Sequence, residues 1–170
     1  FKEVDKLGLA MIEQPLAYDD LVEHAKLQAR LETPICLDES IKRVRHMRRA
    51  VELKSCRYVN IKPPRVGGLQ ASIDIHNLAK ENGIPAWVGG MLESSLGKGV
   101  NLELATLENF VYPNDIGPSS RGIKEDLTEP TLEFPGKEKV FKPSTVPGVP
   151  NLPSPEKLAK FTRQKFVLEV

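Results

Sequence analysis

Three charged residues end three short apolar segments, and together they could do chemistry. Glu13 closes "AMIE", Asp38 closes "PICLD" and Lys62 closes "YVNIK", at intervals of 25 and 24 residues. Two neighbouring carboxylates suit Mg²⁺, which proteins hold with a few carboxylates, water and substrate oxygens. A lysine close to such an ion can accept a proton. The pattern therefore predicts removal of a proton α to a carboxylate, with the metal stabilising the enediolate that forms.

Two further polar residues accompany these three. Asn60 precedes Lys62 by two residues, so it shares the strand face of Lys62 and is expected to support the site from its side. Glu39 follows Asp38 directly, so we expect it to point away from the metal and to orient a neighbouring group. Taken singly, a carboxylate at a strand end can be a helix cap or an ion-pair partner, and a lysine before two prolines can be solvated. The matched spacing of all three favours a common site.

The elements that must position these residues alternate between strand and helix. We expect strands at 9–14, 34–38, 58–62 and 84–90, and helices at 18–31, 40–53, 69–82 and 96–109. Ser40 is the expected N-cap of the second of these helices. Alternation with tight connections indicates a parallel sheet covered by helices, and near-continuous apolar strands are typical of a sheet buried on both faces. In a (β/α) barrel the carboxyl ends of the strands carry the active site.

The composition changes toward the C-terminus. Loop residues begin near Asn114, and the range 128–155 is rich in proline and glycine. A short helix at 154–162 and a strand at 165–170 are expected to follow. We predict a partial barrel domain at 1–128 and a tail at 129–170 that wraps the same domain.

The bulk composition excludes several classes of partner. With 24 basic and 23 acidic residues, the chain gives no reason to expect nucleic acid. No apolar run approaches 18 residues, so we expect no transmembrane helix, and no signal peptide is expected at the start. Cys36 and Cys56 are expected to be buried free thiols, which suits a cytoplasmic location. The basic residues of the 40–53 helix are expected to form a solvated outer face. The chain begins at Phe1 inside an amphipathic segment, so we expect it to be part of a longer protein.

Four motifs, "IEQPL", "LDES", "NIKPPRVGG" and "GGMLESSLG", occur in this order. Together they resemble the enolase superfamily in its muconate-lactonizing subgroup, and within it the o-succinylbenzoate synthase / N-acylamino acid racemase family. The resemblance runs from about residue 8 to about residue 130. It implies an α/β fold that is the C-terminal part of an enolase-type (β/α) TIM barrel. It also implies Mg²⁺, with Mn²⁺ as an alternative ion, held by Glu13 and Asp38 as second and third ligands, and Lys62 as the catalytic lysine.

The resemblance further implies which residues contact the substrate. "GGMLES" matches the end of the seventh barrel strand, which assigns Gly90, Met91 and Glu93 to substrate binding, and "NDIGPSSR" matches the loop after the eighth strand, which adds Asp115. The family's Lys-x-Lys strand, its first aspartate ligand and its N-terminal capping domain are absent from this sequence. Gly122 follows Arg121 where relatives often have an aromatic pair, and "SLGKGVN" stands where they often have Gly-Ile-Gly-Arg.

The family resemblance implies an enzyme acting on a small carboxylate. We expect the parent chain to be an o-succinylbenzoate synthase of menaquinone biosynthesis, in which Lys62 stabilises the anionic intermediate by its charge. The alternative is an N-acylamino acid racemase, with Lys62 as one of two acid/base groups, or a related cycloisomerase. We expect the parent chain to form a homo-oligomer. The chain by itself is expected to be inactive, as a partial barrel with exposed strand edges.

Overall fold

A computed structural model describes residues 1–149 and 151–167 of the chain. It divides into two compact units. The first contains residues 1–89 and 104–115, and the second contains the described residues of 90–103 and 116–170. The predicted domain boundary near residue 128 stays a prediction.

The first unit is built on a parallel sheet. Its strands are β1 (Ile12–Glu13), β2 (Ile35–Leu37), β3 (Tyr58–Ile61) and β4 (Ala86–Val88), hydrogen-bonded in sequence order. Phe110 adds one parallel bridge beside Ala86. The predicted α/β class with a parallel sheet is confirmed. The strands are shorter than predicted because only the central residues of each apolar segment pair with a neighbour.

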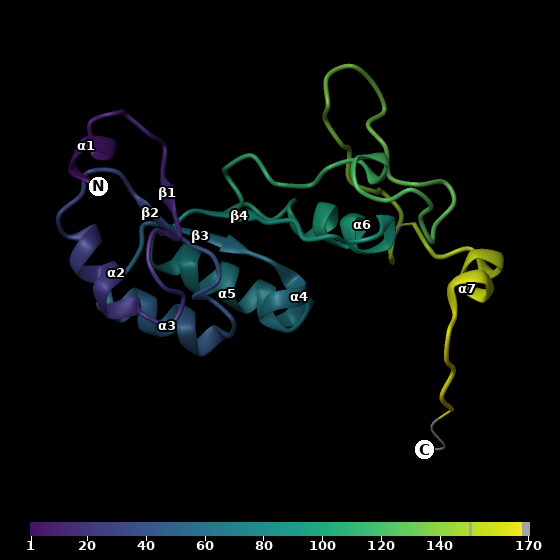
Figure 1. Cartoon of the computed structure of the whole chain (residues 1–170), viewed down its shortest axis with the longest axis horizontal. Helices are drawn as coiled ribbons and strands as arrows, with labels where there is room; N and C mark the ends of the chain where they lie inside the picture. The colour runs from purple at the N-terminus through teal and green to yellow at the C-terminus, as the bar shows by residue number, and fades with distance from the viewer. Residues whose placement is uncertain (150, 168–170) are drawn as a thin grey trace. The chain divides into compact units, whose positions relative to one another are not determined.

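Helices connect the strands in the predicted alternation. Those of the first unit are α1 (Lys2–Asp5), α2 (Leu21–Gln28), α3 (Val44–Leu53), α4 (Pro63–Val66) and α5 (Leu69–Glu81). Helix α3 packs against both α2 and α5, and these helices lie on one side of the sheet (Figure 1). The one-turn helix α4 was not predicted, although two prolines at its start suit the first turn of a helix.

The two faces of the sheet differ in chemistry. One face is apolar, and six of its residues are fully buried: Ile35, Leu37, Val59, Ile61, Ala86 and Val88. Side chains of a strand alternate between faces. The opposite face therefore carries the remaining strand and strand-end residues: Glu13, Cys36, Asp38, Tyr58, Asn60, Lys62 and Trp87. The sheet is therefore apolar on one face only. The polar strand and strand-end residues lie together on the other face.

The prediction that Ser40 caps the helix after β2 is wrong. Helix α3 begins at Val44, and Arg43 occupies the N-cap without a side-chain capping bond. Ile41 is fully buried and lies in the connection between β2 and α3. The Ser40 hydroxyl instead accepts a hydrogen bond from Gln14 Nε2 at 2.9 Å. Ser40 thus belongs to the carboxyl edge of the sheet.

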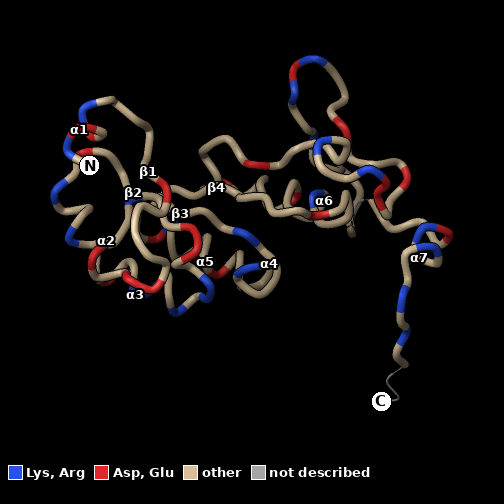
Figure 2. Tube along the Cα trace, in the orientation of Figure 1, with Lys and Arg blue, Asp and Glu red and all other residues tan. Residues whose placement is uncertain are grey.

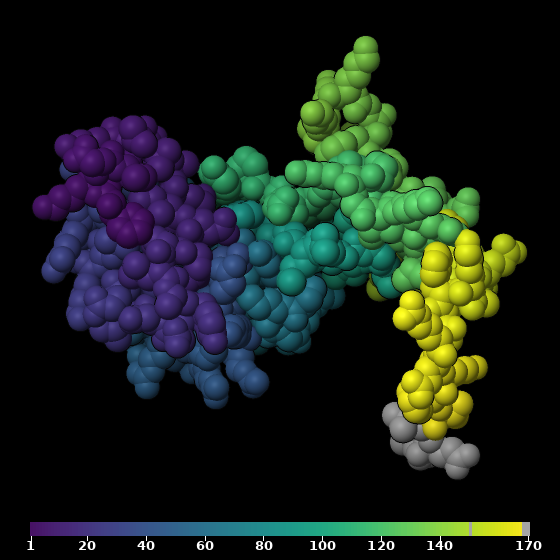
Figure 3. Space-filling model, viewed as in Figure 1, coloured from purple at the N-terminus to yellow at the C-terminus, as the bar shows by residue number. Residues whose placement is uncertain are grey.

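Charge is distributed along the chain without a large block of one sign (Figure 2). The basic residues predicted to face solvent from the α3 region, namely Lys42, Arg43, Arg45, Arg48 and Arg49, are all exposed. Met47 and Ala50 are the buried residues of α3. One side of the helix therefore packs on the core, and the basic residues lie on the side that faces solvent. In the space-filling view the first unit is closely packed, with the N-terminal residues at its surface (Figure 3).

The second unit contains α6 up to Glu103 (helix bounds Ser95–Leu104), the 3₁₀ turn η1 (Ser119–Arg121) and α7 (Pro155–Phe161). The predicted helix at 96–109 therefore ends five residues early, whereas the one at 154–162 is confirmed. Residues 165–167 are not a strand, and the rest of that predicted strand lies outside the described residues. Within residues 1–149 and 151–167, no helix combines the length and apolar character needed to cross a membrane.

A buried carboxylate organises the second unit. Asp126 accepts hydrogen bonds from the backbone N–H and hydroxyl of Ser95, both at 2.8 Å, and from the Ser119 hydroxyl. Its other oxygen accepts from Leu127 N–H at 2.6 Å. Ser95 is the first residue of α6, so the carboxylate also lies at the positive end of a helix. Burial raises the pKa of Asp126, but the bonds from Ser119 and Ser95 outweigh it and the net pKa is lowered.

We expect Asp126→Asn to lower the free energy of unfolding by about 2 kcal/mol at pH 7, because hydrogen bonds to a charged group are lost. The pKa of Asp126 is lower in the folded state than in the unfolded state, where it is about 4. The carboxylate therefore stabilises the fold at pH values above the unfolded pKa, and this stabilisation is lost as the pH falls through the folded pKa. The difference between wild type and Asp126→Asn should therefore shrink below about pH 4. Urea unfolding between pH 3 and 7 measures it. Asp19→Asn, at an exposed aspartate, is the control, and a pH-independent difference would contradict the argument.

Candidate active site

The strand ends that carry the predicted residues are offset by two residues from one strand to the next. Glu13 is aligned with Cys36, so Asp38 lies two residues further along. The alignment of β2 with β3 puts Asp38 level with Asn60, two residues before Lys62. Offsets of two keep all these side chains on one face of the sheet. Such a stagger is what strands that tilt around a barrel require.

Asp38 is the centre of the charged cluster. Its Oδ2 accepts a hydrogen bond from Lys62 Nζ at 2.7 Å, and its Oδ1 is paired with the guanidinium of Arg65. The Asp38 side chain is only 7% exposed, and those of Lys62 and Arg65 are 19% and 12% exposed. Ion pairs that are shielded from water in this way interact more strongly than surface pairs. The structure thus brings Asp38 and Lys62 into direct contact, as their positions in the sequence predicted.

Glu13 is linked to the cluster by Asn60. Asn60 Nδ2 donates to Glu13 Oε1 at 2.7 Å, and the Asn60 side chain is almost fully buried. Glu13 itself is exposed. Asn60 was predicted to support the site from its side. Its bond reaches from β3 across β2 to one carboxylate oxygen of Glu13 at the end of β1, and its role in a site stays a prediction.

Arg65 also belongs to the charged cluster, although its role was not predicted from the sequence. Besides Asp38, its guanidinium donates to Ile41 O at 3.0 Å and to Asn60 O at 2.6 Å. Burial lowers the pKa of Arg65 to about 10, against an opposing effect of the negative charge of Glu13, so it stays a cation at neutral pH. The signal was present in "KPPR": the prolines start a helical turn, which returns the fourth residue to the side of the lysine.

Five other residues were predicted for the site: Glu39, Gly90, Met91, Glu93 and Asp115. Glu39 is exposed and makes no hydrogen bond or ion pair within residues 1–149 and 151–167, so nothing in its contacts orients a neighbour. Gly90, Met91 and Glu93 belong to the second unit, where Glu93 accepts from Met91 N–H at 2.7 Å. Asp115 belongs to the first unit, and its N–H donates to Val88 O at 3.0 Å. Their contact with a substrate stays a prediction.

The donors present suit Mg²⁺ in kind. Glu13 and Asp38 offer hard carboxylate oxygens at neighbouring strand ends, and Mg²⁺ prefers such ligands. The part of the chain that the structure describes holds no group of three or more His, Cys, Asp or Glu side chains placed to bind a metal. These two carboxylates would therefore be part of a ligand set.

Apolar and sulfur-containing side chains lie beneath the charged cluster. Trp87 Nε1 is 3.3 Å from Cys36 Sγ, so the indole N–H donates to the sulfur. Burial raises the pKa of Cys36 to about 12, against the opposing effect of the Trp87 bond. Burial likewise raises the pKa of Cys56 to about 12. Both cysteines are free, as predicted, and burial favours the protonated thiol in each.

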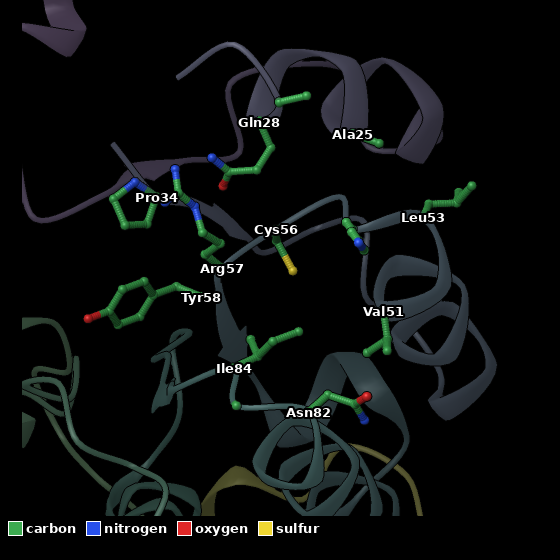
Figure 4. Close-up of a pocket in the computed structure, with 13 residues that line it drawn as sticks. Ala25, Gln28, Pro34, Val51, Leu53, Cys56, Arg57, Tyr58, Asn82 and Ile84 are labelled. Carbon is green, nitrogen blue, oxygen red and sulfur yellow. The ribbon is translucent and has the colours of Figure 1, made fainter. Parts of the chain in front are cut away.

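A cavity of about 810 Å³ lies at the opposite, amino-terminal ends of the strands (Figure 4). Its lining includes Gln28, Cys56, Arg57, Tyr58 and Ile84. Arg57 already donates to the carbonyls of residues 31 and 32, both at 2.7 Å. The amino-terminal end of a barrel serves stability rather than catalysis. The charged residues predicted for the site meet at the other, carboxyl edge of the sheet.

Comparison with known proteins gives a family match and several close relatives. Residues 1–149 match the family described as "Enolase C-terminal domain-like". The chain is 52% identical over 135 residues to an o-succinylbenzoate synthase from Geobacillus stearothermophilus, covering 79% of this chain and 36% of the relative. It is also 52% identical over 132 residues to an N-succinylamino acid racemase from Thermus thermophilus, covering 78% and 36%.

A solved structure is similar along nearly the whole chain. It is a probable mandelate racemase from Alicyclobacillus acidocaldarius, with a TM-score of 0.88 and 36% sequence identity, covering 95% of this chain and 42% of that one. The chain thus spans little more than a third of the length of the curated relatives that it matches. The parallel α/β architecture is that of part of a TIM barrel, as these relatives are TIM-barrel proteins of the enolase superfamily.

Proposed function

Because this chain belongs to the enolase C-terminal domain-like family, we propose that the protein carrying it removes a proton from the carbon next to a carboxylate. The observation that carries the proposal is the contact of Lys62 Nζ with Asp38 Oδ2 at 2.7 Å, on the sheet face that also presents Glu13. A cationic lysine held there lies where negative charge would develop on a carboxylate substrate. Preorganised charge of this kind is among the largest contributions to catalysis.

Members of the superfamily bind Mg²⁺, and Glu13 and Asp38 would hold the ion in this protein. Bound Mg²⁺ would supply positive charge to the carboxylate oxygens of the substrate. The residues of the chain do the rest. Asn60 keeps Glu13 in place, Arg65 compensates part of the charge of Asp38, and Lys62 offers an ammonium group to the reacting substrate.

The favoured reaction is the syn dehydration that forms o-succinylbenzoate. A proton leaves the carbon next to the carboxylate, the neighbouring hydroxyl leaves with it as water, and an aromatic ring results. The family's second-strand lysine would take the proton, and Lys62 would stabilise the anion by its charge. The 52% identity to an enzyme of this name supports the proposal.

Racemisation of an N-succinylamino acid is the second candidate, because a racemase is equally similar to the chain. In that reaction the two lysines work on opposite faces of the substrate, and Lys62 returns a proton to the same carbon. Both reactions pass through the same kind of anion, so the site as described suits either.

The test is proton NMR in D₂O on the full-length protein that carries this chain, with Mg²⁺ added. The sample contains the cyclohexadiene carboxylate precursor of o-succinylbenzoate together with an N-succinylamino acid. Conversion of the precursor to aromatic product supports the synthase. Deuterium that enters only at the amino acid Cα supports the racemase. If neither compound changes, the proposed activity is wrong and only the family assignment stands.

The 170-residue chain alone is proposed to be inactive. Within the described residues it presents two carboxylates of a metal site, and β1 pairs with a strand on one side only. An open strand edge favours pairing with another chain. Gel filtration of the chain is expected to show self-association, and a clean monomer would contradict the edge argument. We also propose that the full-length protein assembles as a homo-oligomer, which gel filtration of the full-length protein would test.

A further inference from the structure

One polar side chain joins the ends of β1 and β2. Gln14 Oε1 accepts from the N–H groups of Asp38 at 2.9 Å and Ser40 at 3.2 Å. Gln14 Nε2 donates to Ser40 Oγ at 2.9 Å and to Leu16 O at 3.2 Å. The amide therefore uses both of its donors and two acceptor positions, all on the loops that follow the two strands. Gln14 is the next residue after Glu13, and its oxygen holds the backbone of Asp38.

Gln14 adopts a backbone conformation that is unfavourable for its type. Its φ is +40°, in the left-handed region that glycine tolerates and glutamine does not favour. Such a conformation costs about 1–2 kcal/mol. It persists only when surrounding contacts hold it, and strained residues of this kind gather at functional sites. The bonds from the Gln14 amide are contacts of that kind.

His24 orients the Gln14 amide. The His24 ring is fully buried, and its Nδ1 lies 2.6 Å from Asp20 O, so Nδ1 carries the proton and donates it. Nε2 is then an acceptor, which receives Leu16 N–H at 3.3 Å and faces Gln14 Nε2 at 3.4 Å. Both Gln14 N–H groups already donate to Ser40 and Leu16, so His24 acts only by presenting an acceptor, which favours the amide nitrogen over the amide oxygen on its side. The amide oxygen therefore points toward the backbone of Asp38.

We infer that Gln14 is a positioning residue that sets the separation of Glu13 and Asp38 for joint binding of a divalent cation. The inference rests on the proposed function, because it takes those two carboxylates as ligands of Mg²⁺. Gln14 is not taken as a ligand, because its amide oxygen already accepts the N–H groups of Asp38 and Ser40. It ties the strand end that carries one carboxylate to the strand end that carries the other. Groups that orient metal ligands typically contribute about 10–100-fold to metal affinity.

The experiment compares three variants of the full-length protein. Gln14→Met keeps the length of the side chain without its hydrogen bonds, and Gln14→Gly also relieves the positive φ, so a folded variant is available even if methionine disturbs the backbone. Gln28→Met is the matched control. Gln28 is a buried glutamine, whose Oε1 accepts Ile35 N–H at 2.6 Å at the amino-terminal end of β2 (Figure 4).

Two properties are measured: Mg²⁺ affinity by calorimetry, and hydrogen exchange of the Asp38 and Ser40 amides without metal. We expect both Gln14 variants to bind Mg²⁺ at least tenfold more weakly and to exchange these amides faster. Gln28→Met should lower stability and leave Mg²⁺ affinity unchanged. Wild-type affinity in both Gln14 variants, or an equal loss in Gln28→Met, overturns the inference alone. If the wild-type protein binds no Mg²⁺, the proposed metal site fails, and the inference fails with it.

Discussion

Replacement of Lys62 by alanine in the full-length protein is expected to lower kcat about 10³-fold, since a preorganised charge or proton donor at the reacting carbon is lost. The fold should survive, because Arg65 still compensates the buried charge of Asp38. The loss should therefore appear in turnover and much less in the free energy of unfolding.

Lys62→Arg separates the two candidate reactions. Arginine keeps the positive charge but does not release a proton at working pH. If Lys62 acts through its charge, as proposed for the synthase, Lys62→Arg should be at least about tenfold more active than Lys62→Ala. If it must exchange a proton with the substrate, as in the racemase, arginine should be as inactive as alanine.

The measurement is the rate of product formation, or of deuterium incorporation, at saturating substrate and Mg²⁺. Lys80→Ala is the control, because Lys80 is a half-exposed lysine of α5 that is ion-paired with Glu108 and lies outside the cluster. It should turn over like the wild type. Full activity in Lys62→Ala would show that Lys62 takes no part in the reaction. The proposed mechanism would then be wrong, because it depends on the ammonium group of Lys62.

The sequence allowed the order of the elements to be predicted because each apolar segment is bounded by polar residues or proline. It also predicted that Asp38 and Lys62 meet, since carboxyl ends of neighbouring parallel strands lie at one edge of the sheet. Strand lengths were less predictable. Pairing depends on neighbours that lie far apart in the sequence, so Ile12–Glu13 is all that remains of a predicted six-residue strand.

The partners of the predicted residues were harder to predict for the same reason. Gln14 was visible in "IEQPL", but nothing local indicates that its amide spans to Asp38, 24 residues away. Ser40 has the type and position of a helix cap, and only the tertiary bond to Gln14 shows its other use. Arg65 could have been assigned from its helical spacing to Lys62. The steric need for glycine at position 89, directly after β4, could not be predicted, because it depends on how closely β4 approaches the side chains of β3.

Gly89→Ala is the second substitution with a large expected effect. Gly89 follows β4, is level with Lys62 and donates its N–H to Ile61 O at 3.0 Å. A Cβ at this position would overlap Asn60 Oδ1 and stand 2.7 Å from both Asn60 Cγ and Lys62 Cε. The φ of Gly89 is not in the left-handed region, so the constraint is steric. Glycine is required because two site residues occupy the space of its missing side chain.

We therefore expect Gly89→Ala to displace two side chains together: Asn60, which holds Glu13, and Lys62, which is proposed to act on the substrate. Overpacking of this kind costs about 2 kcal/mol, and displacing reacting groups by about 1 Å can cost about 100-fold in rate. Urea unfolding and kcat/KM measure the two effects. Gly122→Ala is the control, because its Cβ would meet nothing within 4 Å.

A double substitution shows whether the overlap with Asn60 is the cause. In Gly89→Ala combined with Asn60→Ala, the closest overlap is gone, so stability should recover toward that of Asn60→Ala alone. Activity should stay low, because Glu13 has lost its hydrogen bond from Asn60 and Lys62 Cε is still crowded. Additive losses of stability would show that alanine at 89 acts elsewhere. Wild-type rate and stability in Gly89→Ala would contradict the close approach of β4 to Lys62.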